Sequence, residues 1–226
     1  QVEDGAPAER TLNIPNGIDL PRMEKVRAAR GAEIPQSACL IGRVVPIKDV
    51  KTFLRAMRTL VNEIPDAKGW IAGPEDEDKE YAAECRSLVT SLGLEKNVEF
   101  LGFQKIDELL PKVGVVVLSS ISEALPLVLL EGFAAGVPAV STDVGSCRQL
   151  IEGLNEEDRA FGKAGSVVGI ADPEALGKAV AKLLSDPQAW HEAQQAGIRR
   201  VETLYTQQQM FGSYRELYQG LLEGER

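Results

Sequence analysis

The sequence predicts an α/β protein built on a doubly wound parallel sheet, with helices added at its C-terminal end. Short apolar runs rich in β-branched residues recur along the chain, and each is too short for a helix. Between these runs lie segments in which apolar residues repeat at helical spacing. Strands that alternate with helices in this way form a parallel sheet covered by helices on both faces, here with about six strands.

The expected strands follow the apolar runs in chain order. They cover residues 38–45, 68–73, 98–104, 114–118, 136–142 and 167–170. Residues 50–64 place their apolar side chains at helical spacing with basic residues opposite, so we expect this helix to lie on the sheet. Further helices are expected over residues 75–92, from Pro126 onward, and over residues 173–184 and 187–204. Asp172 before Pro173 forms a typical helix start.

Two later segments complete the division of the chain. Residues 151–165 are polar and include three consecutive acidic residues, which predicts a surface loop. Aromatic and apolar residues between 210 and 222 form one stripe of a final helix. We therefore expect a hinge or linker segment over residues 1–20, a ligand-binding domain over residues 21–204 and a C-terminal helix over residues 205–226.

The charge balance and the cysteines exclude several classes of function. Lysine and arginine total 25 against 34 acidic residues, a net charge of −9 without any basic run, so we expect no binding to nucleic acid. Cys39, Cys85 and Cys147 are far apart and lack metal-ligand spacing, which favours reduced thiols in a cytoplasmic protein and argues against a zinc site. No apolar run is long enough to span a membrane.

A polar loop between a buried strand and a helix carries the central motif. Residues 119–132 read SSISEALPLVLLEG, and we expect the helix to begin at Pro126, whose fixed φ suits the first turn. Ligands bind at such junctions because free N–H groups face the crevice. Glu123 in the loop and Glu131 in the helix can then accept hydrogen bonds from the vicinal hydroxyls of a sugar or ribose. Alternatively, Glu123 complements the helix dipole and Glu131 is a solvated surface charge.

Two cations precede this motif at a comparable junction. Arg43 lies at the end of the first expected strand and Lys48 at the start of the helix that follows, so both could hold a diphosphate together with the helix N–H groups. The competing interpretation is that both are surface charges that favour solubility. The single histidine, His191, lies among polar residues and is expected at the surface.

These motifs resemble those of the retaining glycosyltransferases of family four, which have the GT-B fold. The resemblance rests on two glutamates separated by seven residues, on GRVVPIK at residues 42–48 and on IPNGID at residues 14–19. It implies that the chain is the Rossmann-like C-terminal half of a GT-B enzyme and starts at the interdomain hinge. It further implies that an acceptor-binding first domain is missing and that the last helix packs back on that domain.

The resemblance also implies roles for individual residues. Arg43 and Lys48 would neutralise the leaving nucleotide diphosphate without a metal ion, and Glu123 would bind the donor sugar. The residues implied in nucleotide binding are Glu131, Ala124, Leu125, Pro126, Phe103 and Gln104. A core position is the alternative for Phe103.

Two departures from the family pattern make the sugar contacts less defined. The chain has Glu123-Ala124 where Glu-Gly is commoner, and Gly145-Ser146 where Gly-Gly is usual.

On this resemblance, the full enzyme transfers a hexose from a UDP-sugar, UDP-glucose or a related UDP-hexose, to a growing exopolysaccharide with retention of anomeric configuration. The implied partners are the nucleotide-sugar donor, a glycan acceptor bound by the missing domain and a membrane-bound polysaccharide synthase complex. The isolated fragment is expected to be inactive. One alternative is a UDP-sugar epimerase of the same fold, which would need acid/base groups that this histidine-poor chain does not display. The other is a non-catalytic α/β nucleotide-binding module.

Overall fold

A six-stranded, all-parallel sheet with the order β3-β2-β1-β4-β5-β6 forms the centre of the molecule. The structure, a computed structural model, describes residue 7 and residues 11–223. The predictions for residues 1–6 and 8–10 of the hinge segment and for residues 224–226 of the last helix lie outside this range. The strands are β1 (Ser37–Ile41), β2 (Lys68–Ala72), β3 (Val98–Gly102), β4 (Val115–Leu118), β5 (Ala139–Thr142) and β6 (Gly165–Val168). The predicted doubly wound α/β fold is confirmed.

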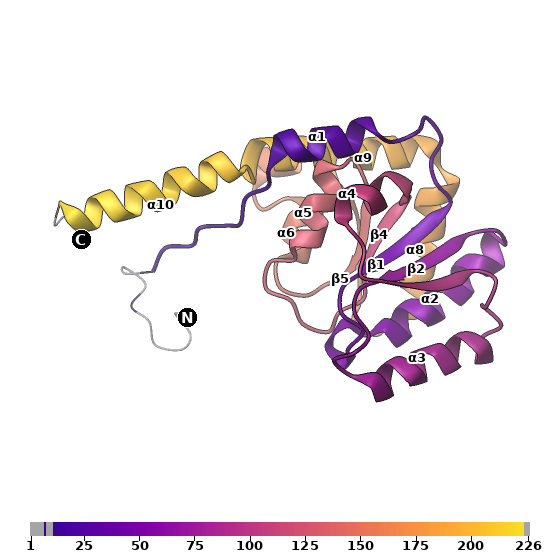
Figure 1. The fold of residues 1–226 in the computed structure, drawn as a ribbon. Helices are drawn as coiled ribbons and strands as arrows, with labels where there is room; N and C mark the ends of the chain where they lie inside the picture. Colours follow the sequence, from indigo (N-terminus) through magenta and orange to yellow (C-terminus); the bar gives the residue numbers. More distant parts are fainter. Residues whose placement is uncertain (1–6, 8–10, 224–226) are drawn as a thin grey trace.

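Helices cover both faces of the sheet (Figure 1). The helices are α1 (Leu20–Ala28), α2 (Val50–Glu63), α3 (Lys79–Ser91), α4 (Ile106–Leu109), α5 (Leu127–Ala134), α6 (Cys147–Glu152), α7 (Glu156–Arg159), α8 (Pro173–Ser185), α9 (Pro187–Leu204) and α10 (Gln207–Leu222), with 3₁₀ turns at Pro46–Lys48 and Leu110–Lys112. One core cluster joins the sheet to α2, α3, α8 and the first half of α9, and the other joins it to α1, α4, α5, α6 and the end of α9. The central strands β1, β4 and β5 are buried on both faces, which explains their apolar and small residues.

The order in which successive strands are added to the sheet reverses between β1 and β4. It winds outward from β1 through β2 to β3, and then crosses back to place β4 beside β1, with Cys39 opposite Val116. In open parallel sheets, ligands bind beyond the carboxyl ends of the strands at this reversal point. The loops after β1 and β4 are therefore the place to look for a site, and they contain Lys48 and Glu123.

The start of α5 differs by one residue from the prediction. Pro126 is the N-cap rather than the first helical residue, with φ −73° and ψ 105°, and α5 begins at Leu127. The proline ring fixes φ but leaves ψ free, so the same ring fits an extended cap as well as a helical turn.

The polar segment 151–165 is largely exposed, as its composition predicted, but it is not entirely a loop. It contains α7, and Asp158 within it is buried and pairs with Arg200 of α9, whose Nε lies 2.5 Å from Asp158 Oδ1. Arg200 is completely buried and also donates hydrogen bonds to the carbonyl oxygens of Leu150, Ile151 and Gly162. One guanidinium therefore fixes this whole segment to α9.

The two ends of the domain lie side by side. Ile18 N donates to the carbonyl oxygen of Tyr205 at 2.8 Å, and Gln207 N donates to the carbonyl oxygen of Ile18 at 3.0 Å. Beyond this bridge α10 projects away from the sheet (Figure 1), and it has no buried residue. Its exposed large side chains are Phe211, Tyr214, Tyr218, Leu221 and Leu222. None of the helices in the described part of the chain is both long and apolar enough to cross a membrane.

Candidate functional site

An ion pair joins the loops after β1 and β4. Lys48 ends the 3₁₀ turn after β1, and its Nζ lies 2.5 Å from Oε1 of Glu123 in the loop after β4. Ser120 Oγ donates to the same carboxylate oxygen at 2.7 Å. The Lys48 and Glu123 side chains are only 23% and 13% exposed, so water screens this pair less than an ordinary surface pair. The structure thus brings together two predicted site residues that are 75 positions apart in the sequence.

Backbone contacts hold these two loops in register. Ser119 Oγ donates to the carbonyl oxygens of Lys48 and Asp49 at 2.9 and 3.0 Å. Ile121 N donates to the carbonyl oxygen of Ile47 at 3.0 Å. Because these bonds involve the main chain next to Lys48 and Glu123, they position both side chains independently of the ion pair.

The loop after β5 supports Glu123 and Ala124 from the other side. Gly145 has φ +49°, a conformation that favours glycine, and a Cβ there would lie 2.1 Å from the carbonyl oxygen of Glu123. Ser146 N donates to the carbonyl oxygen of Ala124 at 2.9 Å. The close approach explains why position 145 must be glycine, while at position 146 it is the backbone N–H that makes the contact.

The N-terminus of α5 is open. Pro126 makes no side-chain capping hydrogen bond, whereas the other helices of eight or more residues in the described range are capped by a side chain. Free N–H groups and the positive end of the helix dipole therefore face the carboxyl edge of the sheet beside Glu123. By contrast, the start of α2 is occupied by its own acid, since Asp49 Oδ1 accepts a hydrogen bond from Thr52 N. The helix N–H groups expected beside Lys48 are thus available at α5 and not at α2.

A cleft of about 470 Å³ lies at the carboxyl ends of β1, β2 and β3. Arg43, Phe103 and Gln104 line it, so the structure gathers these three predicted residues around one space. Arg43 Nη1 lies 2.6 Å from Oε1 of Glu77 in an exposed pair. Phe103 is 81% exposed, which shows that the alternative of a core position is wrong for this residue.

Glu131 lies one turn into α5, and the charges of two residues that the sequence did not single out, Arg22 and Asp107, affect its pKa. Burial raises the pKa of its carboxyl, and the positive charge of Arg22 nearby opposes that shift. Arg22 lines the cleft and binds Asp107, with Nε 3.0 Å from both carboxylate oxygens. Arg22 and Asp107 are 85 positions apart, so no local pattern connects them.

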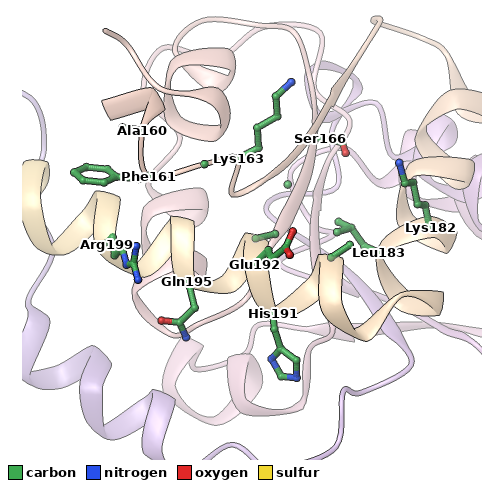
Figure 2. A pocket seen from close by; sticks show the side chains of 14 residues that line it. Ala160, Phe161, Lys163, Ser166, Lys182, Leu183, His191, Glu192, Gln195 and Arg199 are labelled. Carbon is green, nitrogen blue, oxygen red and sulfur yellow. The ribbon is translucent and has the colours of Figure 1, made fainter. Parts of the chain in front are cut away.

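A larger cavity, of about 860 Å³, lies elsewhere (Figure 2). It reaches Gly165 and Ser166 at the amino end of β6 and contains none of the predicted site residues. Figure 2 shows that Lys163 and His191 point to opposite sides of it, so these two side chains do not converge on one ligand. His191 is exposed, as predicted.

Comparison with known proteins identifies the family of the chain. The sequence profile described as "Glycosyl transferases group 1" matches residues 24–200. The chain belongs to this family. An exopolysaccharide phosphotransferase of Streptomyces coelicolor is 35% identical over 187 residues, which cover 80% of the chain and 18% of that protein. A D-inositol 3-phosphate glycosyltransferase of Corynebacterium urealyticum is 32% identical over 168 residues, 70% of the chain and 38% of that protein. The group 1 glycosyl transferase chain thus spans less than half the length of these relatives.

Solved structures share the fold of this group 1 glycosyl transferase chain. Anabaena HepE in complex with UDP and glucose superposes with a TM-score of 0.82 at 20% identity, and the match covers 97% of the chain and 59% of HepE. Sucrose-phosphate synthase of Thermosynechococcus elongatus superposes with a TM-score of 0.76 at 26% identity, covering 93% of the chain and 52% of that protein. The Rossmann-like half of a GT-B fold is therefore confirmed.

Proposed function

We propose that this chain is the donor-binding part of a retaining glycosyltransferase that transfers a hexose from a UDP-sugar to a growing exopolysaccharide. The observation that carries the proposal is the open N-terminus of α5 beside the Lys48–Glu123 pair at the reversal point of the sheet. That arrangement offers positive charge and free N–H groups to a diphosphate, and a carboxylate to sugar hydroxyls. The structure of HepE with UDP-glucose and the exopolysaccharide relative support this choice of substrates.

In this proposal negative charge builds up on the diphosphate as the bond from the sugar anomeric carbon to the phosphate oxygen breaks. Lys48, Arg43 and the N–H groups of α5 stabilise that charge, which lowers the barrier if they interact more strongly with the leaving group than with the bound donor. They supply the positive charge that a metal ion supplies elsewhere, so we propose that no metal is needed.

The two ion pairs at the site give the proposed binding step a definite form. Lys48 is paired with Glu123 and Arg43 with Glu77. We propose that the diphosphate takes over both cations, which releases the Glu123 carboxylate for the hydroxyls of the sugar. Glu131 binds the ribose, Phe103 and Gln104 contact the base, and the backbone of residues 124–126 contacts the donor.

The biological setting is a further part of the proposal. Residues 42–56 and 152–168 resemble the corresponding stretches of PelF, the glycosyltransferase of Pel exopolysaccharide synthesis. We therefore propose that the full-length protein acts with a membrane-bound polysaccharide synthase complex and binds its glycan acceptor through a further domain, against which α10 packs.

Calorimetric titration of the chain with UDP, UDP-glucose, NAD and ATP tests the proposal. We expect UDP and UDP-glucose to bind and NAD and ATP to bind more weakly. Lys48→Ala should weaken the binding of UDP by roughly 1.5–3 kcal/mol. It should weaken the binding of uridine by much less, because uridine lacks the diphosphate that Lys48 would bind.

Lys51→Ala is the matched control, since Lys51 is a neighbouring lysine that pairs with Glu84 on α3, away from the site. Equal losses of UDP and uridine affinity in Lys48→Ala, or no response to UDP at millimolar concentration, would contradict the proposal. An epimerase would instead change the configuration of a UDP-sugar without any acceptor.

A further inference from the structure

The side chain of Ser120, to which the sequence motif assigns no role, is bonded to Glu123. Its hydroxyl donates to Oε1 of Glu123 at 2.7 Å, and the residue is only 1% exposed. A ligand therefore has almost no access to this hydroxyl. Ser120 can affect a bound donor only through the carboxylate that it holds.

Ser120 is fixed independently of the ion pair. At the end of β5, the completely buried Thr142 donates from Oγ1 to the carbonyl oxygen of Ser120 at 2.6 Å. The next residue, Ile121, donates from its backbone N to the carbonyl oxygen of Ile47 at 3.0 Å. Because both bonds hold the main chain, the hydroxyl of Ser120 keeps its place when the partners of the carboxylate change.

The two carboxylate oxygens of Glu123 differ in their surroundings. Oε1 accepts hydrogen bonds from both Lys48 Nζ and Ser120 Oγ, whereas no group of the described residues donates to Oε2. The described part of the chain also has no buried polar side-chain atom without a hydrogen-bond partner, so Oε2 must reach the solvent. A ligand can therefore bind Oε2 without displacing Ser120.

The two donors to Oε1 differ in how freely they move. Lys48 carries its charge at the end of a flexible four-carbon chain, whereas a single side-chain torsion places the hydroxyl of Ser120. In the proposed binding step, Lys48 moves to the diphosphate and Ser120 stays. Glu123, whose side chain is 13% exposed, then keeps a hydrogen bond where a carboxylate without partners would be destabilising.

We propose that Ser120 is a positioning residue that holds Glu123 by Oε1 and directs Oε2 at the hydroxyls of the donor sugar. This inference rests on the proposed function, since it assumes that Glu123 binds the sugar. The protein holds one oxygen of the carboxylate, and the ligand receives the other. A carboxylate fixed in this way accepts a hydroxyl from a defined direction, so Ser120 contributes to the selection of the sugar.

Ser120→Ala should separate sugar binding from nucleotide binding. Without the hydroxyl, the carboxylate can rotate once Lys48 has moved, which weakens its hydrogen bond to the sugar. We expect the affinity for UDP-glucose to fall by about tenfold, on the order of one hydrogen bond, and that for UDP to change by no more than about twofold. Ser120→Cys nearly keeps the size of the side chain but has a weaker donor, so it should lose less UDP-glucose affinity than Ser120→Ala.

The test is calorimetric titration of UDP and UDP-glucose into the wild-type chain, Ser120→Ala, Glu123→Ala and the double variant. If Ser120 acts through Glu123, Ser120→Ala should cause no further loss once residue 123 is alanine, so the two single losses will not add. A merely structural effect of Ser120 would lower the affinity for both ligands and would persist in the double variant.

Ser37→Ala is the matched control. Ser37 is also nearly buried, and its hydroxyl donates to the carbonyl oxygen of Lys112 at 2.9 Å. It begins β1, so it lies at the amino end of the sheet, opposite to the candidate site. Its substitution should leave the ratio of UDP-glucose to UDP affinity unchanged, even where urea denaturation shows a lower free energy of unfolding.

The outcomes also separate this inference from the proposed function. If the wild-type chain does not bind UDP-glucose, or if Glu123→Ala binds it as well as the wild type does, the proposed function fails. If Glu123→Ala loses UDP-glucose affinity and Ser120→Ala does not, the positioning role is overturned. Equal losses of UDP and UDP-glucose in Ser120→Ala, or losses that add in the double variant, would overturn it as well.

Discussion

Lys48 and Glu123 stabilise each other's charges within the candidate site. Each is the other's partner across the reversal point, and Ser120 binds the same oxygen of Glu123. Neither charge is therefore left unsatisfied in a half-buried position, where an isolated charge would be destabilising. A ligand that carries both a diphosphate and hydroxyl groups can replace the ion pair with one new partner for Lys48 and one for Glu123. A ligand that carries only one of these groups leaves one of the two charges unpaired.

The two glutamates should differ in what they recognise. Glu131→Ala is expected to weaken UDP and UDP-glucose alike, because the ribose is common to both. Glu123→Ala should leave UDP affinity nearly unchanged and weaken UDP-glucose, because only the sugar meets this carboxylate. Titration of both ligands into both variants checks this, with Glu84→Ala as a surface control; equal loss of UDP in the two variants would overturn the assignment.

The buried Arg200–Asp158 pair should be a major determinant of stability. Arg200→Met leaves the Asp158 carboxylate and several carbonyl oxygens buried without their donor, and is expected to cost about 3–5 kcal/mol of unfolding free energy. Urea denaturation measures the effect. Arg199→Met, at the adjacent exposed position, should change the free energy by no more than about 0.5 kcal/mol. Similar values for the two variants would show that the pair contributes little.

At the scale of elements, three loops and one helix end build the part of the site around Glu123. The loops after β1 and β4 are bonded to each other, the loop after β5 presses on Glu123, and α5 contributes its open end. The position of each loop follows from the strand before it, so the sheet order determines which loops can meet.

Gly145→Ala tests this dependence between loops. The new Cβ would collide with the carbonyl oxygen of Glu123 and the φ of +49° is strained for alanine, so we expect a loss of about 1–3 kcal/mol in unfolding free energy. The displaced Glu123 should also weaken UDP-glucose more than UDP. Gly31→Ala, at a position with open space around it, is the control for both measurements. Unchanged sugar recognition would mean that this loop does not position Glu123.

The sequence predicted the elements that depend on local pattern and missed those that depend on distant partners. Buried strands and amphipathic helices came from apolar spacing, and α9 was predicted with its observed bounds. Within residues 151–165, which are largely exposed as predicted, the buried Asp158 was missed for a different reason. Three acidic residues in a row indicate a solvated loop until Arg200, 42 positions away, neutralises one of them.

The same distinction applies to the candidate site. Arg43, Lys48, Glu123 and Glu131 were singled out because their residue types and spacing carry a pattern. Arg22 and Asp107 each look like an ordinary surface charge in the sequence, and their contact exists only because α1 and α4 pack side by side. Exposure of Phe103 was likewise not predictable, since an aromatic residue after a strand is usually core.

At the scale of the whole molecule, the sheet and its two helical layers form one unit, and α10 is an appendage. No residue of α10 is buried, while its aromatic and apolar side chains are exposed. Such a surface is typical of a segment that packs against something else, and the proposed further domain would cover it.

Truncation measures how much α10 contributes to the free energy of unfolding. A chain that ends at Met210 should unfold with a free energy within about 1 kcal/mol of the whole chain, because none of the described residues that it lacks is buried. A chain that ends at Leu204 should be clearly less stable, since it also loses Tyr205 and the bridge between Ile18 and Thr206. Denaturation of the three chains in urea distinguishes these outcomes. A large loss on ending at Met210 would mean that α10 is part of the folded unit.

The bridge between Ile18 and Thr206 has a mechanical consequence. The chain enters and leaves the sheet unit at one place, and two adjacent segments bonded to each other make that connection. A domain joined by a single linker can rotate about the linker axis. Two connecting segments that are bonded to each other resist this rotation and mainly allow bending. A neighbour joined through both segments would therefore move relative to the sheet unit mainly by bending at this bridge.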